Sequence, residues 1–560
     1  MDGGGATLTT HRPASLRPDH VRRHLAWAVV VAVPAVFLAV FFAWPLWTVL
    51  SRGLAGTGTG AAWEVLTSPG VPASIRNTVV LACLGTVGSV ALGVPAAWAL
   101  YRLRWRGQIA ARAIVAVPFV LPTVVVAAAF GALFARHGLL GFAGLDQSVT
   151  AIVCALVFFN VSVVTRVVGT AWASQDPGAG LAARTLGAGR GRAFRTVTLP
   201  ALAPSLGAAS AVVLLFCSTS FGIVLVLGGT RVRTVETEIF LQVNQFLDLH
   251  AAAVLAVLQL VFVAAALALA SWARRGRDRV AAGRELDGSR AARRGDRLPV
   301  AAVLVALSVL IMLPGFALLE RSLRVAGGGH SLANYAALVD PPAAVALPVS
   351  VAQAALNSVT TAALAATIAA LLTVAVSAAT VRGPRWTRGI DAVAMGPLGV
   401  SAVVIGLGML LTLNRNVAGV DLRSSWLLVP LAQALVALPL AVRILVPATR
   451  AIDPRLRAAA ASLGASPARI WRTIDWRLLR GPVALAAGFA FAIAMGEFGA
   501  TAFVARPDRP TLPLAIARLL SRPGAQNVGM GFAAAVLLAV VTAAVMLATE
   551  RLRTRVKADV

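Results

Sequence analysis

The stretch DPGAGLAARTLGAGRGRAFRTVTLPAL at residues 176–202 returns as DPRLRAAAASLGASPARIWRTIDWRLL at 453–479, 277 residues further along the 560-residue chain. Each copy predicts a short Ala-rich helix, a glycine break and a second amphipathic helix. The Asp-Pro pair that opens each copy is typical of a helix N-terminus, where the carboxylate caps free N–H groups and proline fits the first turn. Gly187 and Gly464 are typical of a left-handed turn at a helix end.

The repeat extends well beyond these two stretches. The same offset holds without a gap from about residue 160 to 240 and slips slightly further upstream. Other matched pairs are Phe221-Gly222 with Phe498-Gly499, Thr234 with Thr511, and, upstream of the slip, Asn77-Thr78 with Asn357-Ser358. The chain therefore consists of two homologous halves.

Long apolar runs fill most of each half. Hydrophobic residues make up 58% of the chain and charged residues only 13%, about half the charge of a typical soluble protein. A helix needs about 20 apolar residues to span a bilayer. Twelve runs qualify: 25–50, 78–100, 113–135, 149–171, 203–227, 249–272, 298–319, 355–381, 391–413, 426–448, 482–505 and 528–549. Prolines predict kinks within these runs at Pro34, Pro45, Pro118, Pro122 and Pro397.

These runs predict an all-α polytopic membrane protein with about twelve transmembrane helices. Six spans per half return the chain to the same side, so the two six-helix repeats are parallel. The predicted units are an N-tail at 1–24, a first six-helix domain at 25–272, a basic linker at 273–297, a second six-helix domain at 298–549 and a C-tail at 550–560. The matched loops, 172–200 and 449–481, connect the fourth and fifth spans of each domain.

The charge of the chain indicates its orientation. A formal net charge of +28 comes almost entirely from arginine, since Lys557 is the only lysine. The basic residues occur in short clusters between apolar runs, so they do not form the basic face of a nucleic-acid-binding protein. With the N-terminus inside, 35 of the 50 basic residues fall in cytoplasmic segments, as the positive-inside rule requires. Both termini, the linker and both matched loops are therefore expected in the cytoplasm.

The matched loops have two interpretations from their residues alone. A helix–turn–helix with an exposed apolar stripe and basic flanks suits a groove on a partner protein. The alternative is a basic loop that lies on lipid headgroups.

A family resemblance favours the first interpretation. Both loops resemble the "EAA" loop of the membrane subunits of ATP-binding-cassette importers, whose pattern is Glu-Ala-Ala, three residues, Gly and a distal Leu-Pro. The residues that carry the resemblance, with the aspartates that open the loops, are Asp176, Ala182, Ala183, Gly187, Leu199 and Pro200 in the first copy and Asp453, Ala459, Ala460 and Gly464 in the second. The Glu is replaced by Leu181 and Ala458, and the second copy has Trp476-Arg477 in place of Leu-Pro. These departures allow the two copies to dock with unequal strength.

Two such domains fused in one chain resemble the permeases of thiamine and ferric-iron importers. The resemblance implies a pore in a bacterial plasma membrane that works with two copies of a cytoplasmic ATPase subunit and with an extracytoplasmic substrate-binding protein. ATP and Mg would bind to the ATPase subunit. The chain itself is expected to be no enzyme and to hold no cofactor or metal, because Lys557 follows no Gly-rich phosphate loop and the three cysteines have no metal-ligand spacing.

Polar residues within the spans indicate a candidate pathway, since such residues are costly in lipid and usually face the protein interior. Glu497 is the only carboxylate within the predicted inner spans, and its repeat counterpart is Ser220. The predicted lining near the outer gate is Ser218, Thr219, Ser220, Phe221, Glu497 and Phe498. The alternative for Glu497 is an ion pair with Arg506 or Arg509.

Other arginines have predicted contacts as well. Arg166 and Arg443 could pair with Asp176 and Asp453, or reach lipid headgroups. The segments 228–248, 320–354 and 506–527 are predicted outer loops on which a binding protein would dock. The basic residues there that could meet acidic groups are Arg231, Arg233, Arg509 and Arg522.

One other function and two substrates stay open. A proton- or ion-coupled secondary transporter can also have twelve helices in two halves, but it would need ionisable residues in its core spans. Ferric iron prefers oxygen-rich ligands, which the apolar interior offers sparingly, and this favours an organic cation such as thiamine. An iron importer can leave recognition to its binding protein, so both substrates remain candidates.

Overall fold

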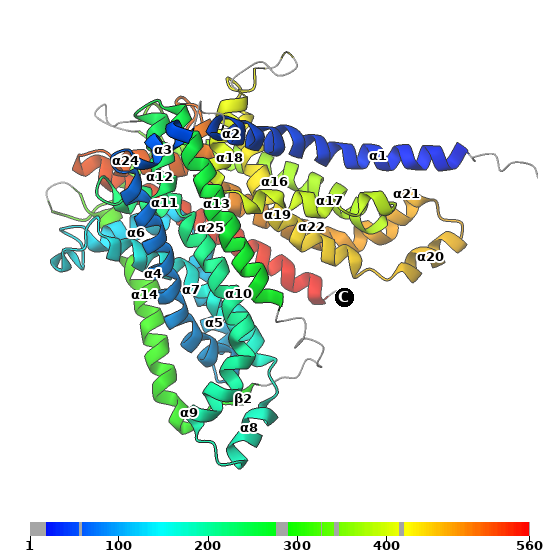
Figure 1. Cartoon of the computed structure of the whole chain (residues 1–560), viewed down its shortest axis with the longest axis horizontal. Helices are drawn as coiled ribbons and strands as arrows, with labels where there is room; N and C mark the ends of the chain where they lie inside the picture. The colour runs from blue at the N-terminus through cyan, green and yellow to red at the C-terminus, as the bar shows by residue number, and fades with distance from the viewer. Residues whose placement is uncertain are drawn as a thin grey trace, which may run out of the picture.

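Helices make up almost all of the regular structure of this chain (Figure 1). The computed structural model describes residues 18–54, 59–275, 289–325, 328–340, 347–413, 419 and 421–558. The predicted N-tail and linker therefore lie largely outside the described residues. Within the described part the all-α fold class is confirmed, because its only strands have two residues each.

The first half contains the helices α1 (Pro18–Leu38), α2 (Trp44–Leu54), α3 (Thr59–Thr67), α4 (Val71–Ala97), α5 (Gln108–Ala116), α6 (Thr123–Phe134), α7 (Val149–Ala173), α8 (Pro177–Thr185), α9 (Arg190–Ala193), α10 (Leu199–Ser218), α11 (Phe221–Gly228), α12 (Val235–Asn244) and α13 (Leu249–Arg275). The second half contains α14 (Arg297–Leu323), α15 (Ala333–Ala336), α16 (Val351–Arg382), α17 (Ile390–Ala394), α18 (Ala402–Thr412), α19 (Leu428–Arg450), α20 (Pro454–Ser462), α21 (Pro467–Ile470), α22 (Trp476–Gly496), α23 (Thr501–Val504), α24 (Leu512–Leu520) and α25 (Ala525–Ala558). The strands β1 (Leu103–Arg104) and β2 (Arg290–Ala291) pair in parallel and tie the end of the linker to the loop after α4.

The number of membrane-spanning segments agrees with the sequence. Ten helices of the described chain are long and apolar enough to cross a membrane, some of them after continuation through short π-helical turns. Two further segments are bent helix pairs, Gln108–Phe119 with Thr123–Phe134 and Arg385–Gly399 with Ala402–Thr412, with bends of 98° and 97°. The predicted kinks at Pro118, Pro122 and Pro397 fall at these bends.

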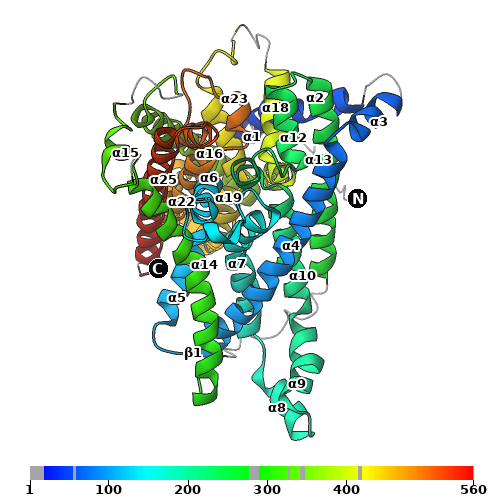
Figure 2. The same ribbon diagram turned by 90° about the vertical axis from the view of Figure 1, so that its left-hand side faces the viewer.

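The helices form two arms that meet at one end (Figure 1). The first arm contains α4, α5, α7, α10 and α14 and ends in α8 and α9. The second contains α1, α16, α17, α19 and α22 and ends in α20 and α21. Short helices, including α11, α12, α18 and α24, gather where the arms meet, and we call this region the junction. Figure 2 again shows α8 and α9 at the far end of the first arm, so both matched loops lie at arm tips, away from the junction.

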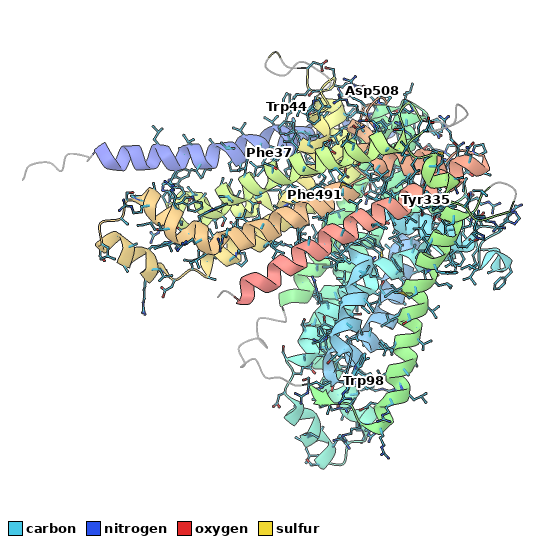
Figure 3. The ribbon with its side chains drawn as sticks, turned by 180° about the vertical axis from the view of Figure 1, so that it is seen from behind. Phe37, Trp44, Trp98, Tyr335, Phe491 and Asp508 are labelled. Atoms are coloured by element: carbon cyan, nitrogen blue, oxygen red, sulfur yellow. The ribbon has the colours of Figure 1, made fainter. Side chains whose placement is uncertain are left out.

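The first long helix of each half packs against the other half. Helix α1 contacts α16 and α17 of the second half, and α14 contacts α4 and α6 of the first. Figure 3 shows the packing of α1 on the second half from behind. Helix α1, which carries Phe37, runs beside the second arm, where α22 carries Phe491. The boundaries at 25–272 and 298–549 thus describe the sequence repeat, whereas each arm contains helices from both halves.

Small residues let the helices of an arm approach closely. A Cβ atom on Gly85 of α4 would lie 2.8 Å from the Cys217 Sγ atom, and one on Gly93 would lie 2.6 Å from the Val164 Cβ atom. Large apolar side chains instead cover the outward faces of long helices; Leu371, for example, is 67% exposed. Small residues inside and large apolar residues outside are the distribution expected for a helix bundle in lipid.

Candidate functional site

The matched loops at the arm tips begin and end as the sequence predicts. The carboxylates of Asp176 and Asp453 accept hydrogen bonds from the backbone N–H groups two residues further on, at 2.7 and 2.9 Å. Gly187 and Gly464 follow the first helix of each loop with φ angles of +88° and +80°, the left-handed region that favours glycine. The predicted caps and turns are therefore confirmed in both copies.

The residues of the family pattern lie on the surface of these loops. Those that the structure places as exposed or half-exposed are Ala182, Ala183, Gly187, Leu199, Pro200, Ala459, Ala460 and Gly464. Beside the glycine turns, Leu186 and Leu463 are 88% and 87% exposed. The two tips thus carry a matched pair of leucines that are among the most exposed apolar side chains of the described residues.

The second helix of each loop continues directly into a long helix of the arm. A π-helical turn, Phe194–Thr198, joins α9 to α10, and the matched turn Trp471–Asp475 joins α21 to α22. Helices α10 and α22 then run to the junction, where they end at Ser218 and Gly496. A displacement of either tip would therefore reach the junction through one continuous helical rod.

The second loop has an ionic brace that the first lacks. Asp475 is fully buried and lies 3.0 Å from an Arg382 nitrogen and 2.8 Å from an Arg457 nitrogen. In the first half, Thr198 occupies the position of Asp475, and Gly180 occupies that of Arg457. One ion pair thus fixes the second loop to α16 of its arm and the other joins α20 to the turn before α22, at a position where the first loop has none.

Aromatic side chains close the junction between the halves. Phe221 and Phe498, which are counterparts in the repeat, stack with ring centroids 5.1 Å apart and an interplanar angle of 18°. Phe240 of α12 contacts Phe503 of α23 edge-on at 5.8 Å. The stacked rings are only 4% and 3% exposed, so we call these four phenylalanines the aromatic seal.

The predicted pathway residues gather at this seal. Ser218, Ser220 and Glu497 are buried beside it, and Thr219 is half-buried. The carboxylate of Glu497 accepts hydrogen bonds from the Ala500 N–H at 2.7 Å, from the Thr501 N–H at 3.0 Å and from the Thr501 hydroxyl. It therefore caps α23.

The alternative predicted for Glu497, an ion pair with Arg506 or Arg509, is wrong. Its oxygens are occupied by α23, and Arg506 pairs with Asp508 of its own loop at 2.9 Å.

Two segments predicted as outer loops contain buried helices. Helix α12 lies within 228–248 and α24 lies within 506–527, and most of the residues of each helix are buried. These segments were predicted only as outer loops, and the structure adds that part of each is a helix packed inside the protein. The basic residues predicted to dock a partner lie in the flanking turns, exposed or half-exposed: Arg231, Arg233, Arg509 and Arg522.

Matched polar side chains fix the starts of α12 and α24. The Asn77 amide donates to the backbone carbonyl two residues before α12 at 3.0 Å, and the Thr78 hydroxyl accepts from the first N–H of α12 at 2.9 Å. Asn357 and Ser358 make the same two bonds to α24, at 3.2 and 2.7 Å. Asn77-Thr78 and Asn357-Ser358 therefore have the same structural role in the two halves: each pair anchors the start of a short helix at the junction.

Sequence reasoning missed two buried acidic residues of α12, Glu236 and Glu238. Glu236 of α12 is fully buried and accepts a hydrogen bond of 3.2 Å from the hydroxyl of Ser401, which caps α18 in the other half. The whole segment was assigned to an outer loop because α12 has only ten residues and two of its first four are acidic. The repeated Asn-Thr and Asn-Ser pairs were the signal that could have placed it.

Arg166 and Arg443 do not brace the matched loops. Both side chains are exposed on their helices, while Asp176 and Asp453 cap α8 and α20. Among the described ion pairs none joins these arginines to these aspartates. The structure thus favours the other alternative, in which both arginines extend towards headgroups.

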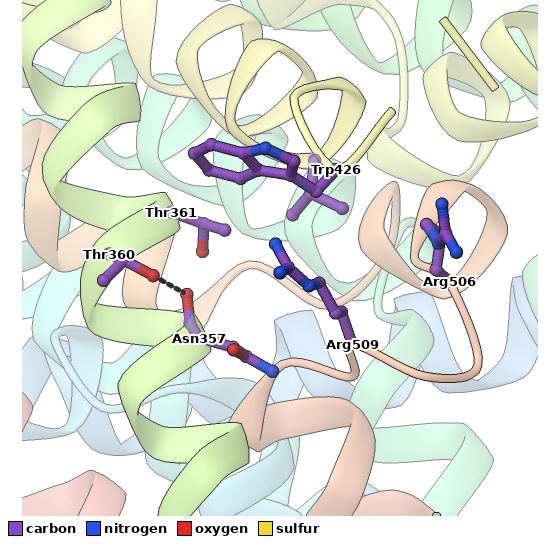
Figure 4. Close-up of a pocket in the computed structure, with 7 residues that line it drawn as sticks. Asn357, Thr360, Thr361, Trp426, Arg506 and Arg509 are labelled. Atoms are coloured by element: carbon purple, nitrogen blue, oxygen red, sulfur yellow. Dashed lines mark hydrogen bonds between the residues drawn. The ribbon is translucent and has the colours of Figure 1, made fainter. Parts of the chain in front are cut away.

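A basic pocket of about 230 Å³ opens at the junction end of α16 (Figure 4). The Arg509 guanidinium lies over the Trp426 ring, 6.0 Å from its centroid. The neighbouring Arg506 guanidinium holds the pKa of the Asp508 carboxyl below its usual range. The first half has Gly229 and Val232 at the positions of the two arginines, so this pocket belongs to the second half alone.

Two halves, up to twelve spans and a sealed junction between matched segments define a polytopic membrane transport protein. A family model described as "Binding-protein-dependent transport system inner membrane component" matches residues 89–275 and 371–558. The chain belongs to this family and contains its domain twice. It is a permease subunit of an ATP-binding-cassette importer, as the loops predict, and the alternative of a secondary transporter is set aside.

Curated relatives fall into two groups by coverage. The thiamine transport system permease protein ThiP of Brucella abortus is 27% identical over 85% of this chain and 87% of its own length. The molybdenum transport system permease protein ModB of Mycobacterium tuberculosis is 35% identical over 45% of this chain and 91% of its own length. The sulfate transport system permease protein CysT of Escherichia coli is 31% identical over 40% of this chain and 82% of its own length. The arrangement of two fused domains is thus the one shared with ThiP.

Replacing Thr78 by Val tests the anchor of α12. The substitution preserves the side-chain shape but leaves a buried N–H group without an acceptor, which typically costs about 1–3 kcal/mol. We expect a lower melting temperature of the purified protein in detergent. Thr86→Val is the matched control, because the Thr86 hydroxyl bonds only to a carbonyl of its own helix. Equal destabilisation by the two changes would contradict the anchor.

Replacing Asp475 by Asn tests the brace of the second loop. Removing one partner of a buried ion pair typically costs about 3–5 kcal/mol, and we expect the lower end because the Arg382 and Arg457 side chains are 22% and 18% exposed. Thr198→Asn makes the corresponding change in the first loop, where no brace exists, and should alter the unfolding free energy far less. A melting temperature unchanged by Asp475→Asn would show that the brace does not stabilise the loop.

Proposed function

We propose that this chain forms the pore of a thiamine importer, driven by two copies of a separate ATPase subunit that dock on the loops 172–200 and 449–481. The observation that carries the docking assignment is the pair of nearly bare leucines, Leu186 and Leu463, at the tips of the two arms. A cleft on each ATPase subunit would take up one leucine together with the short helix before it. ATP and Mg would be held by the ATPase subunits.

The arms explain how docking could drive transport. The continuous path from each tip through α10 or α22 ends beside the aromatic seal. If the two ATPase subunits move together when they bind ATP, the tips follow and the halves rotate at the junction. Such a rigid-body change between two packed states is a common gating mode of transport proteins.

The orientation and the outer partner complete the proposal. The excess of arginine near the arm tips supports a cytoplasmic position for the loops and for both termini. A substrate-binding protein would then dock on the opposite face, at the junction. The basic pocket beside Trp426 offers Arg509 to an acidic residue of that partner.

Two observations support thiamine as the substrate. ThiP shares both domains with this chain, whereas the named molybdenum and sulfate permeases match less than half of it. The junction also contains the buried carboxylates of Glu236 and Glu497 beside the aromatic seal. Carboxylates disfavour an anion, and aromatic rings suit an aromatic cation such as thiamine. Ferric iron remains the second candidate because carboxylates can also bind it.

Charged residues at the two tips test the docking assignment. Burying a leucine side chain contributes about 1.5–3 kcal/mol, so the double variant Leu186→Asp/Leu463→Asp should lower ATPase activity coupled to transport at least tenfold. Ile109→Asp changes an apolar residue that is 82% exposed outside the two loops and should leave the coupling intact. Coupled ATPase activity at the wild-type level in the double variant would refute the assignment.

The substrate is tested with the complete importer in proteoliposomes. The permease is reconstituted with the ATPase and the binding protein encoded near it, and labelled thiamine is offered. We expect ATP-dependent thiamine uptake that requires the binding protein. Uptake of ferric iron, sulfate or molybdate without uptake of thiamine would overturn the substrate assignment and leave the docking assignment standing.

A further inference from the structure

Glu236 is a buried carboxylate at the contact between the two halves. Its relative exposure is 0%, and one carboxylate oxygen accepts the Ser401 hydroxyl from the other half at 3.2 Å. The second oxygen, Oε1, makes no hydrogen bond of normal geometry, and the Gln259 side chain of α13 is the other polar group that faces the carboxylate. Among the described residues no arginine or lysine forms an ion pair with this carboxylate. Burial without a balancing charge raises the pKa of the Glu236 carboxyl, so this group carries its charge only when water or a cation reaches it.

The repeat shows that the fold does not need this carboxylate. Helix α24 begins at Leu512 with the same two anchoring bonds as α12, yet the position matched to Glu236 is occupied by Pro513. An uncharged residue at this position thus supports the same local structure. We therefore look for a role of Glu236 that is specific to the first half.

The junction has two other buried carboxylates, Glu238 and Glu497, and they differ from Glu236 in their partners. Glu238, two residues further along α12, faces Arg233 at 3.9 Å and accepts a hydrogen bond from Gln242 at 3.1 Å. Glu497 caps α23 with both oxygens. Of these three carboxylates only Glu236 has neither a cationic partner nor a helix to cap through both oxygens, so it is the one that is available to a ligand.

The aromatic seal lies on the same side of α12 as Glu236. Phe240 follows Glu236 by one helical turn, so both side chains project from one face of α12. Phe240 contacts Phe221 with a centroid distance of 5.5 Å and Phe503 edge-on at 5.8 Å. A carboxylate next to several aromatic rings is the combination that binds an organic cation, since the rings attract the charge through their faces.

We propose that Glu236 is a cation-binding site on the translocation pathway, which opens when the halves separate and selects for the positive charge of the substrate. Ser401 and Phe498 belong to the second half and would move away with it. The carboxylate and the rings of Phe221 and Phe240 would then face the pathway together. An anion would be repelled at this point, so the site would select substrates by their charge after the binding protein has released them. This inference rests on the proposed function, because the pathway must carry a cation.

The test removes the charge and keeps the shape of the side chain. Glu236→Gln is introduced into the full importer in proteoliposomes, and two quantities are measured: uptake of labelled thiamine and ATPase activity stimulated by the loaded binding protein. We expect uptake to fall at least tenfold while stimulated ATPase activity stays within twofold of the wild type. Glu238→Gln is the matched control, because it removes the same charge from the same helix at a position that already has a cationic partner. It should transport within twofold of the wild type.

A charge relocated across the contact provides a rescue. Ser401 caps α18 and touches Glu236, and aspartate also serves as a helix cap. The double variant Glu236→Gln/Ser401→Asp should therefore recover a substantial part of the uptake that Glu236→Gln loses. Recovery would support a role of charge in the pathway, which a purely structural role of Glu236 does not predict.

The outcomes separate the two proposals. Thiamine uptake at the wild-type rate in Glu236→Gln would overturn the cation site and leave the importer function intact. A Glu236→Gln variant that loses stimulated ATPase activity and thermal stability together, without rescue by Ser401→Asp, would show a structural role and also overturn the site. Failure of the wild-type importer to take up thiamine would instead refute the proposed function itself.

Discussion

The need to satisfy every backbone hydrogen bond in lipid is the constraint on which this structure depends. Long helices meet it along the arms, and the chain departs from regular helix only where surrounding protein can replace the missing bonds. The two sharp bends, the ends of α10 and α22 and the short helices α11, α12, α23 and α24 all lie at the junction (Figures 1 and 2). The side chains of Asn77, Thr78, Asn357 and Ser358 supply partners there. Within the membrane-spanning part, the irregular backbone therefore lies where the two halves cover each other.

Because both halves meet this constraint with the same residues, the positions at which they differ become informative. Asp475 stands where the first half has Thr198, and it braces one loop and not the other. Glu236 stands where the second half has Pro513, and the local structure is the same. A shared residue is explained by the common fold, whereas a difference at a matched position requires a role specific to one loop or to one wall of the pathway.

The sequence predicted the parts of this molecule whose physical signal is local. Apolar runs marked the spans, Asp-Pro pairs marked the helix caps at 176 and 453, and glycine marked the left-handed turns at 187 and 464. The exchange of α1 and α14 between the halves was not predictable, because it depends on contacts between segments that no periodicity connects. Helices α12 and α24 were assigned to loops, since nine or ten residues are too few to span a membrane. The buried carboxylates of α12, Glu236 and Glu238, were missed for the same reason.

The exchanged helices determine which bodies can move. If each sequence half packed only on itself, the two domains would be held together only by the contacts at the junction. With α1 on the second arm and α14 on the first, each arm is tied to the other by a chain connection at the junction. The arms can then pivot about this end while the tips travel furthest. The stacked rings of Phe221 and Phe498 come from opposite halves, so a small pivot parts them without breaking any helix. In the proposed mechanism, packed side chains at the pivot would therefore convert a large motion of the tips into a switch between two packed states, one closed and one open.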